Sequence, residues 1–126
     1  MTSSLPLDPG TLAERLNRLL PVFFASSRER LSEFIALYLE QSYNYLDQAK
    51  TALEANDVKG IRSAVHAWRP AMPMLGLDEL HELAQSIETR IDEGDLSITE
   101  LTEALKLLSD ETTACAALIR SYRREL

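Results

Sequence analysis

Apolar residues recur every three or four positions along most of this chain, which is the period of a helix that buries one face. No stretch alternates with the period of two that a half-buried strand requires. The first amphipathic segment spans residues 8–21, where Asp8 caps a helix with Pro9 in its first position and Pro21 as its end. The apolar run of residues 22–24 is then predicted to be a connector that packs against the core.

Two longer amphipathic segments follow this first helix. Ser26 and Glu29 have the spacing of a capping box, and the helix that they begin is predicted to run to about Ala55. A tight break at residues 56–57 precedes the third helix, and Asp57 is placed to cap it. The Leu-Gly pair at residues 75–76 is typical of the end of a helix.

The last two segments are equally periodic. The fourth helix begins near Asp78 and ends at Gly94, and its apolar residues step alternately by three and four. Ser97 and Glu100 form a second capping-box pattern, which begins a final helix with a heptad-like apolar seam. Both segments are long enough to cross a small domain, so they are predicted to form the other half of a bundle.

Only a few residues connect consecutive helices, and short connections favour antiparallel neighbours. The pattern therefore predicts an all-α protein. Its architecture is an antiparallel up-down-up-down four-helix bundle over residues 29–125, with an extra short N-terminal helix. No linker or internal repeat divides the chain, so residues 1–126 are predicted to form a single domain.

Composition and charge exclude several classes of function. The chain has 13 Lys and Arg against 20 Asp and Glu, a net charge of −7, which disfavours binding to nucleic acid or to an anionic membrane. Its single cysteine, Cys115, excludes an internal disulfide and a cysteine-based zinc site. The first residues lack a signal-peptide pattern and no apolar run approaches roughly 18 residues, so a cytoplasmic location is expected.

The third predicted helix carries an exposed histidine in a locally basic segment. If Ile61 defines the buried direction, His66 lies about 140° away and faces solvent. Residues 57–70 carry a net charge of +2, whereas residues 77–112 hold eleven acids and two bases. The cations near His66 are Lys59, Arg62 and Arg69. Such cations favour a neutral imidazole and would hold an arriving anion, but a solvated surface histidine also fits this pattern.

Residues 66–77 read His-Ala-Trp-Arg-Pro-Ala-Met-Pro-Met-Leu-Gly-Leu. This stretch resembles the signature of histidine-containing phosphotransfer (Hpt) domains, which is His, any residue, an apolar residue, Lys, Gly, two small residues and Leu-Gly-Ala. The signature continues with apolar residues at helical spacing and a Leu-Glu-like pair. The matching residues here are Leu80, Leu83, Ala84, Ile87 and Glu88. The resemblance extends over roughly residues 29–125.

The resemblance implies a phosphorelay carrier and not an enzyme with its own cofactor or metal. His66 would accept a phosphoryl group from a receiver-domain aspartate and pass it to another receiver. Arg69 stands where the signature has lysine and would neutralise the phosphoryl group. The other expected binding residues are Lys59, Arg62, Ala67 and Pro70. The partners would be response-regulator receiver domains, which supply Mg²⁺, and a hybrid histidine kinase.

Two prolines depart from the Hpt signature. Pro70 replaces its glycine, and Pro73 follows three residues later. Each proline removes a backbone N–H and crowds the preceding turn, at a cost of about 3 kcal/mol inside a helix. The third helix is therefore expected to bend or to end near Arg69, with Pro70 opening a new short turn. The proline ring would also fill space that the glycine leaves for a partner.

Two alternatives remain at this point. Pro70 favours a phosphate-independent pseudo-Hpt adaptor, which binds a kinase or a receiver without carrying phosphate. Met72 and Met74 have the Met-x-Met spacing of some Cu(I) sites, with His66 or His81 as a further ligand, although thioethers at this spacing are more often core residues. Hydrolase and nucleotide-binding motifs are absent from the sequence.

Overall fold

The computed structural model of the chain describes residues 7–126, and all regular structure among these residues is helical. The helices are α1 (Pro9–Phe23), α2 (Arg28–Glu54), α3 (Val58–Trp68), α4 (Ala71–Met74), α5 (Asp78–Glu93) and α6 (Ile98–Arg124). The prediction of an all-α protein is therefore confirmed. None of these helices is long and apolar enough to cross a membrane.

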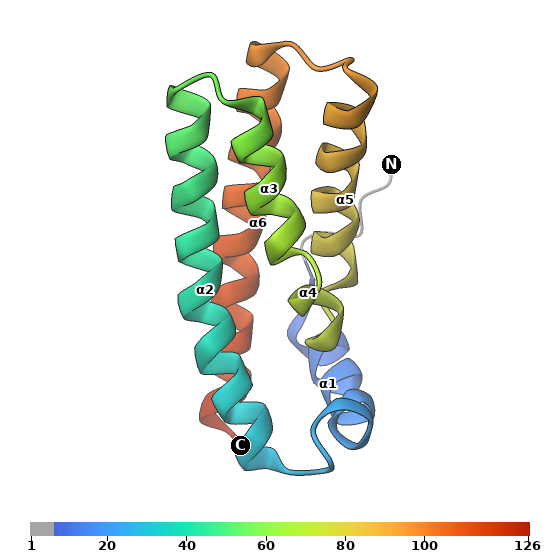
Figure 1. Cartoon of the computed structure of the whole chain (residues 1–126). Helices are drawn as coiled ribbons and strands as arrows, with labels where there is room; N and C mark the ends of the chain where they lie inside the picture. The colour runs from blue at the N-terminus through green and yellow to red at the C-terminus, as the bar shows by residue number, and fades with distance from the viewer. Residues whose placement is uncertain (1–6) are drawn as a thin grey trace.

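Four helices, α2, α3, α5 and α6, surround a common core. α2 packs against α3 and α6, and α5 packs against α3 and α6 from the other side. In Figure 1, α2 and α6 extend along most of the molecule, and α1 lies at the lower end near α4 and the start of α5. The largest fully buried side chains come from every helix and include Leu16, Leu31, Ile61, Trp68, Met72, Leu80 and Leu108. Full burial of each such side chain stabilises the fold by about 1.5–3 kcal/mol.

The first helix is longer than the sequence suggested. Pro21 lies inside α1, which runs to Phe23, so the predicted end at Pro21 and the bounds 8–21 are wrong. The bond that Pro21 cannot donate would go to the carbonyl of Asn17, and both residues belong to the exposed side of α1. The predicted packed connector is also wrong in part, because Val22 is 64% exposed and Phe23 is 48% exposed, whereas Phe24 is buried.

The start of α2 is shifted by one residue from its prediction. Ser27, and not Ser26, caps this helix: its hydroxyl accepts a hydrogen bond from the backbone N–H of Arg30 at 3.2 Å. Ser26 has a φ of +60° and belongs to the tight turn after α1. The predicted capping box of Ser26 and Glu29 is therefore absent, and Glu29 instead lies in the first turn of α2, where a carboxylate complements the helix dipole.

The other predicted helix ends agree with the structure. Asp57 accepts a hydrogen bond from the backbone N–H of Gly60 at 2.9 Å and caps α3. α5 begins at Asp78, and Gly94 ends it with a φ of +70°. Ser97 and Glu100 form the expected reciprocal capping box, with hydrogen bonds of 3.0 and 3.1 Å. Side-chain caps thus mark the connection from α2 to α3 and the connection from α5 to α6.

The prolines interrupt the third predicted helix as expected. α3 ends at Trp68, and Pro70 immediately precedes α4, which is a single turn. Pro70 is therefore the N-cap of this turn and not its first helical residue. The predicted stop at residues 75–76 agrees with the structure, since Gly76 has a φ of +71°. Pro70 has no N–H to donate to the carbonyl of His66, so the series of backbone hydrogen bonds in α3 stops one turn after the histidine.

α1 is joined to the turn between α4 and α5 by a single arginine. The guanidinium of Arg15 donates to both carboxylate oxygens of Glu79, at 2.6 and 2.7 Å, and to the carbonyl of Gly76 at 2.8 Å. These contacts are half-buried, which makes them less screened than an ion pair on the surface. The N-terminal helix therefore supports the segment that follows the two prolines.

Candidate functional site

His66 lies on the outer face of α3, two residues before the helix ends. Its side chain is 57% exposed, as the helical geometry predicted. Ile61, Val65 and Trp68 hold the opposite face of α3 in the core, where each is at most 1% exposed. The burial of these three side chains fixes the rotation of α3, and that rotation presents the imidazole to solvent.

The imidazole of His66 contacts a buried carboxylate of the neighbouring helix. Its Nδ1 atom lies 2.7 Å from Oε1 of Glu88, which belongs to α5 and has a side chain only 7% exposed. A carboxylate accepts hydrogen bonds, so this contact assigns the donor role and the proton to Nδ1. In the neutral ring, Nε2 then keeps its lone pair and is free to act as a nucleophile.

Two arginines share the carboxylate of Glu88 with the histidine. Nη2 of Arg62 lies 3.2 Å from Oε1, and Nε of Arg69 lies 2.9 Å from Oε2. Arg62 also makes a two-bond contact with Asp92, at 2.6 and 3.1 Å. The contact between Arg69 and Oε2 is an ion pair without hydrogen-bond geometry, whereas Oε1 meets both His66 and Arg62. Glu88 is therefore the shared partner of all three side chains.

The locally basic segment expected from the sequence is largely neutralised in the structure. Hydrogen bonding to Arg62 lowers the pKa of Asp92, and the same contact raises the pKa of the Arg62 guanidinium. Arg62 and Arg69 therefore both face carboxylates of α5. Lys59 is exposed and has no carboxylate partner among residues 7–126, and it lies two helical turns before His66. The expectation of an isolated basic patch around His66 is corrected to a balanced cluster of charges.

A sequence model described as the Hpt domain matches residues 33–117, about two thirds of the chain. The chain belongs to the Hpt domain family. The resemblance seen in residues 66–77 is thereby confirmed. Searches of the curated proteins and of the solved structures returned no match. Hpt domains are phosphocarrier modules of phosphorelay signalling rather than typical enzymes, and they interact with receiver domains and histidine kinases of two-component systems.

The remaining residues expected at the Hpt site lie on the same outer surface. Ala67 and Pro70 are exposed, next to His66 in the chain and at the following turn. Arg69 is half-buried, and its Nη1 lies 3.3 Å from Nε2 of His81 on α5. The side chain at the position of the Hpt lysine thus spans from Glu88 to His81, which a guanidinium can do and a lysine ammonium cannot do in the same way.

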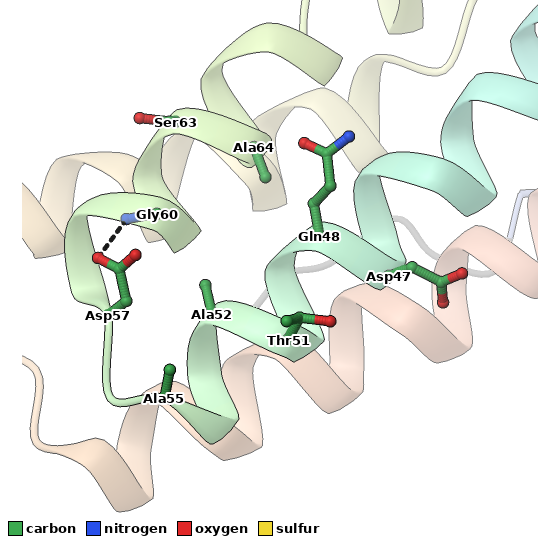
Figure 2. A pocket seen from close by; sticks show the side chains of 9 residues that line it. All are labelled: Asp47, Gln48, Thr51, Ala52, Ala55, Asp57, Gly60, Ser63 and Ala64. Atoms are coloured by element: carbon green, nitrogen blue, oxygen red, sulfur yellow. Dashed lines mark hydrogen bonds between the residues drawn. The ribbon is translucent and has the colours of Figure 1, made fainter.

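A shallow hollow lies beside this site, between α2 and α3. Figure 2 shows its lining, in which Gln48 of α2 extends toward Ala64 of α3. The hollow has a volume of about 600 Å³ and is lined largely by small side chains, including Ala52, Gly60 and Ser63. Ser63 precedes His66 by one helical turn, so the hollow opens on the flank of the histidine. The surface beside His66 on the α2 side is therefore formed mainly by small side chains.

One methionine of the Met-x-Met segment lies in the core of the protein. Met72 is fully buried in the core, where packing accounts for its thioether. Residues 7–126 contain no group of three or more His, Cys, Asp or Glu side chains placed to hold a metal ion. His66 and His81 are instead occupied by Glu88 and Arg69. Core packing is the simpler account of Met72.

Sequence reasoning identified Glu88 only as part of the continuing signature and missed its contact with His66. The two residues are 22 positions apart, and no local pattern joins them. One signal was present: Glu88 follows Ile87, on the flank of the buried stripe of α5. A glutamate at the edge of an apolar stripe needs a partner on the facing helix, which here is α3.

Proposed function

We propose that His66 is the phosphoacceptor of this Hpt domain and that it transfers phosphoryl groups between receiver-domain aspartates. The observation that carries the proposal is the pairing of an exposed imidazole with a buried carboxylate. Glu88 holds the Nδ1 side of the ring at 2.7 Å, and Nε2 is left as the free nitrogen of a 57% exposed side chain. A phosphocarrier needs this combination of a fixed ring and an accessible lone pair.

The proposed transfer balances with no further reactant. The lone pair of Nε2 forms a bond to phosphorus, while the bond from phosphorus to the aspartate oxygen breaks and leaves the receiver with a free carboxylate. The imidazole gains a positive charge, and its Nδ1–H continues to donate to Glu88. The buried carboxylate therefore stabilises the charge that develops on the ring. The reverse steps deliver the group to the aspartate of a second receiver.

The neighbouring residues have distinct proposed roles. Arg69 neutralises charge on the phosphoryl oxygens, and Arg62 supports Glu88 from the other side. Lys59, Ala67 and Pro70 belong to the exposed surface that a partner covers. The chain contributes no cofactor, and the receiver supplies Mg²⁺ together with the aspartate. One proposed donor of the phosphoryl group is the receiver domain of a hybrid histidine kinase.

The proposal also includes the finer architecture of the chain. An antiparallel up-down-up-down arrangement of α2, α3, α5 and α6 is supported by the contacts between these helices and by their short connections. A single domain over residues 1–126 and a cytoplasmic location stay predictions from the sequence. Residues 1–6 lie outside the described part of the chain.

A transfer assay tests the proposed acceptor. A receiver domain phosphorylated with a radioactive label is mixed with the chain, and the transfer of the label to the chain is followed over time. We expect acid-labile label on the wild-type chain and on His81→Gln, the matched variant of the second histidine. His66→Gln is expected to accept none. Equal labelling of wild type and His66→Gln would contradict the assignment.

Pro70 supports one competing function, the adaptor that binds a receiver or kinase without carrying phosphate. Its ring is exposed at the position where the Hpt signature has glycine. The adaptor predicts that the chain binds a receiver, that it takes up no label, and that His66→Ala leaves signalling unchanged. The transfer assay and a binding measurement on the same pair of proteins therefore distinguish the two functions.

A further inference from the structure

The arginines fall into two groups according to whether a carboxylate lies within ion-pair distance. The arginines that contact a carboxylate are Arg15, Arg62, Arg69 and Arg90. Within residues 7–126, those without such a contact are Arg18, Arg28, Arg30, Arg120, Arg123 and Arg124. The second group belongs to α1, the start of α2 and the end of α6, which lie at the lower end of Figure 1. The arginines without an ion pair are thus gathered at one end of an acidic protein.

Two of these side chains are held in fixed orientations by α2. Nε of Arg123 donates to the hydroxyl of Ser32 at 2.9 Å. Nη2 of Arg120 donates to the hydroxyl of Tyr43 at 2.9 Å, and the guanidinium lies 5.7 Å from the centre of the same ring. A cation near a helix C-terminus also interacts with the helix dipole, but that interaction does not require contacts with another helix. These neutral partners orient the guanidinium groups without neutralising them.

The same arginines border an open hollow. Arg120, Arg123, Arg124 and Ser32 line a space of about 370 Å³, and no carboxylate contributes to its lining. Positions 120, 123 and 124 lie on one face of α6, since residues three and four apart are neighbours on a helix. A guanidinium is a planar fork that donates two hydrogen bonds to one carboxylate. Three such groups around one hollow can receive more than one carboxylate.

We propose that this hollow, the arginine pocket, docks an acidic segment of a partner protein through two or more Asp or Glu side chains. Charge complementarity supports this occupant, because the pocket is a cationic patch on a chain with a net charge of −7. The pocket is built by α2 and α6, whereas the contacts of His66 are with α5. A partner can therefore be held at the arginine pocket while the imidazole remains accessible.

Binding of a fluorescently labelled hexaglutamate peptide tests the pocket. The dissociation constant is measured by anisotropy at low ionic strength, where screening is weak. The test variant is Arg120→Gln/Arg123→Gln, and the matched control is Lys50→Gln/Lys106→Gln, which removes the same charge from exposed lysines elsewhere. We expect the arginine variant to bind about tenfold more weakly and the control to stay within about twofold of wild type.

A second variant separates geometry from charge. Arg120→Lys/Arg123→Lys keeps the net charge but loses the planar fork, so it is expected to bind severalfold more weakly than wild type. Circular dichroism verifies that each variant is folded. The proposal is overturned if wild type does not bind the peptide, if both glutamine variants weaken binding equally, or if inorganic phosphate displaces the peptide at an equal concentration. The phosphotransfer assay on His66 is a separate readout, so failure of either proposal leaves the other testable.

Discussion

Nδ1 of the exposed His66 lies 2.7 Å from Oε1 of the buried Glu88. This contact joins α3 to α5 and sets the tautomer of the imidazole, because the carboxylate can only accept. Arg62 and Arg69 contact the same carboxylate, so one glutamate connects the ring to both cations of the site. The orientation of the proposed acceptor therefore depends on a buried residue of the neighbouring helix.

Replacement of Glu88 by glutamine tests this dependence. The amide keeps the shape of the side chain but removes the charge that stabilises the phosphorylated ring. We expect the phosphotransfer rate of Glu88→Gln to fall on the order of tenfold to a hundredfold, as activity does when a carboxylate that supports a metal-bound histidine is lost. Single-turnover transfer from a labelled receiver measures the rate. Glu82→Gln, an exposed glutamate of the same helix, is the control and transfers at the wild-type rate. Unaltered transfer by Glu88→Gln would refute a role for the carboxylate.

Replacement of Pro70 by glycine tests whether the proline ring obstructs a partner. Pro70→Gly restores the residue of the Hpt signature and opens space next to His66. We expect transfer to become faster by up to about tenfold, because small changes in approach have large effects on reaction rate. We also expect the free energy of unfolding to fall by about 1 kcal/mol, because glycine gives the unfolded chain more freedom. The measurements are the initial rate of transfer and the thermal midpoint.

Pro73→Gly is the matched control for this experiment. Pro73 lies within α4, three residues further along, so its replacement alters the same short turn without uncovering the histidine. Its transfer rate is expected to equal that of wild type. A transfer rate for Pro70→Gly at or below that of wild type would mean that the ring does not obstruct the partner.

Burial raises the pKa of the Cys115 thiol to about 11. At pH 8 only about 0.1% of this thiol is thiolate, so we expect a thiol reagent to label the native chain about a hundredfold more slowly than the unfolded chain. The folded-state pKa lies above the ordinary value of 9.0, so the folded state binds the proton more tightly. The stabilisation that the protonated Cys115 thiol gives the folded state is complete below about pH 9 and is lost as the pH rises toward 11.

Denaturant unfolding across this alkaline range measures the contribution of Cys115. Cys115→Ala is expected to lose less stability than wild type between pH 9 and pH 11. Part of the decline remains in the variant, because burial also raises the pKa of Tyr38. Two results would show that the core does not protect Cys115. One is rapid labelling of the native thiol. The other is an equal loss of unfolding free energy between pH 9 and pH 11 in wild type and in Cys115→Ala.

Much of the fold was predictable because its signals are local. The caps at Asp57 and Ser97 and the stop at Gly94 act within a few residues, and each is found in the structure. The error at Pro21 arises because this exposed proline removes only one backbone hydrogen bond, and α1 continues for just two residues beyond it. The shift from Ser26 to Ser27 depends on the shape of a turn, which propensity does not specify.

At the candidate site, the exposure of the histidine was predictable from the sequence, but the charges around it were not. The exposure of His66 followed from helical geometry, because the buried residues of α3 fix the rotation of that helix. The charge balance around it did not follow, because Glu88 and Asp92 come from another helix. Counting charges within one segment gave a basic patch, whereas the packing of α3 against α5 brings acids to the same place.

Phosphorus NMR of the phosphorylated chain tests the central claim most directly, because the shift and its proton dependence identify the nitrogen that carries phosphorus. The account predicts one phosphohistidine signal, bonded at Nε2 of His66, which is absent in His66→Gln and present in His81→Gln. Phosphorus on Nδ1 of His66, on His81, or on no histidine after exposure to a phosphorylated receiver would contradict it.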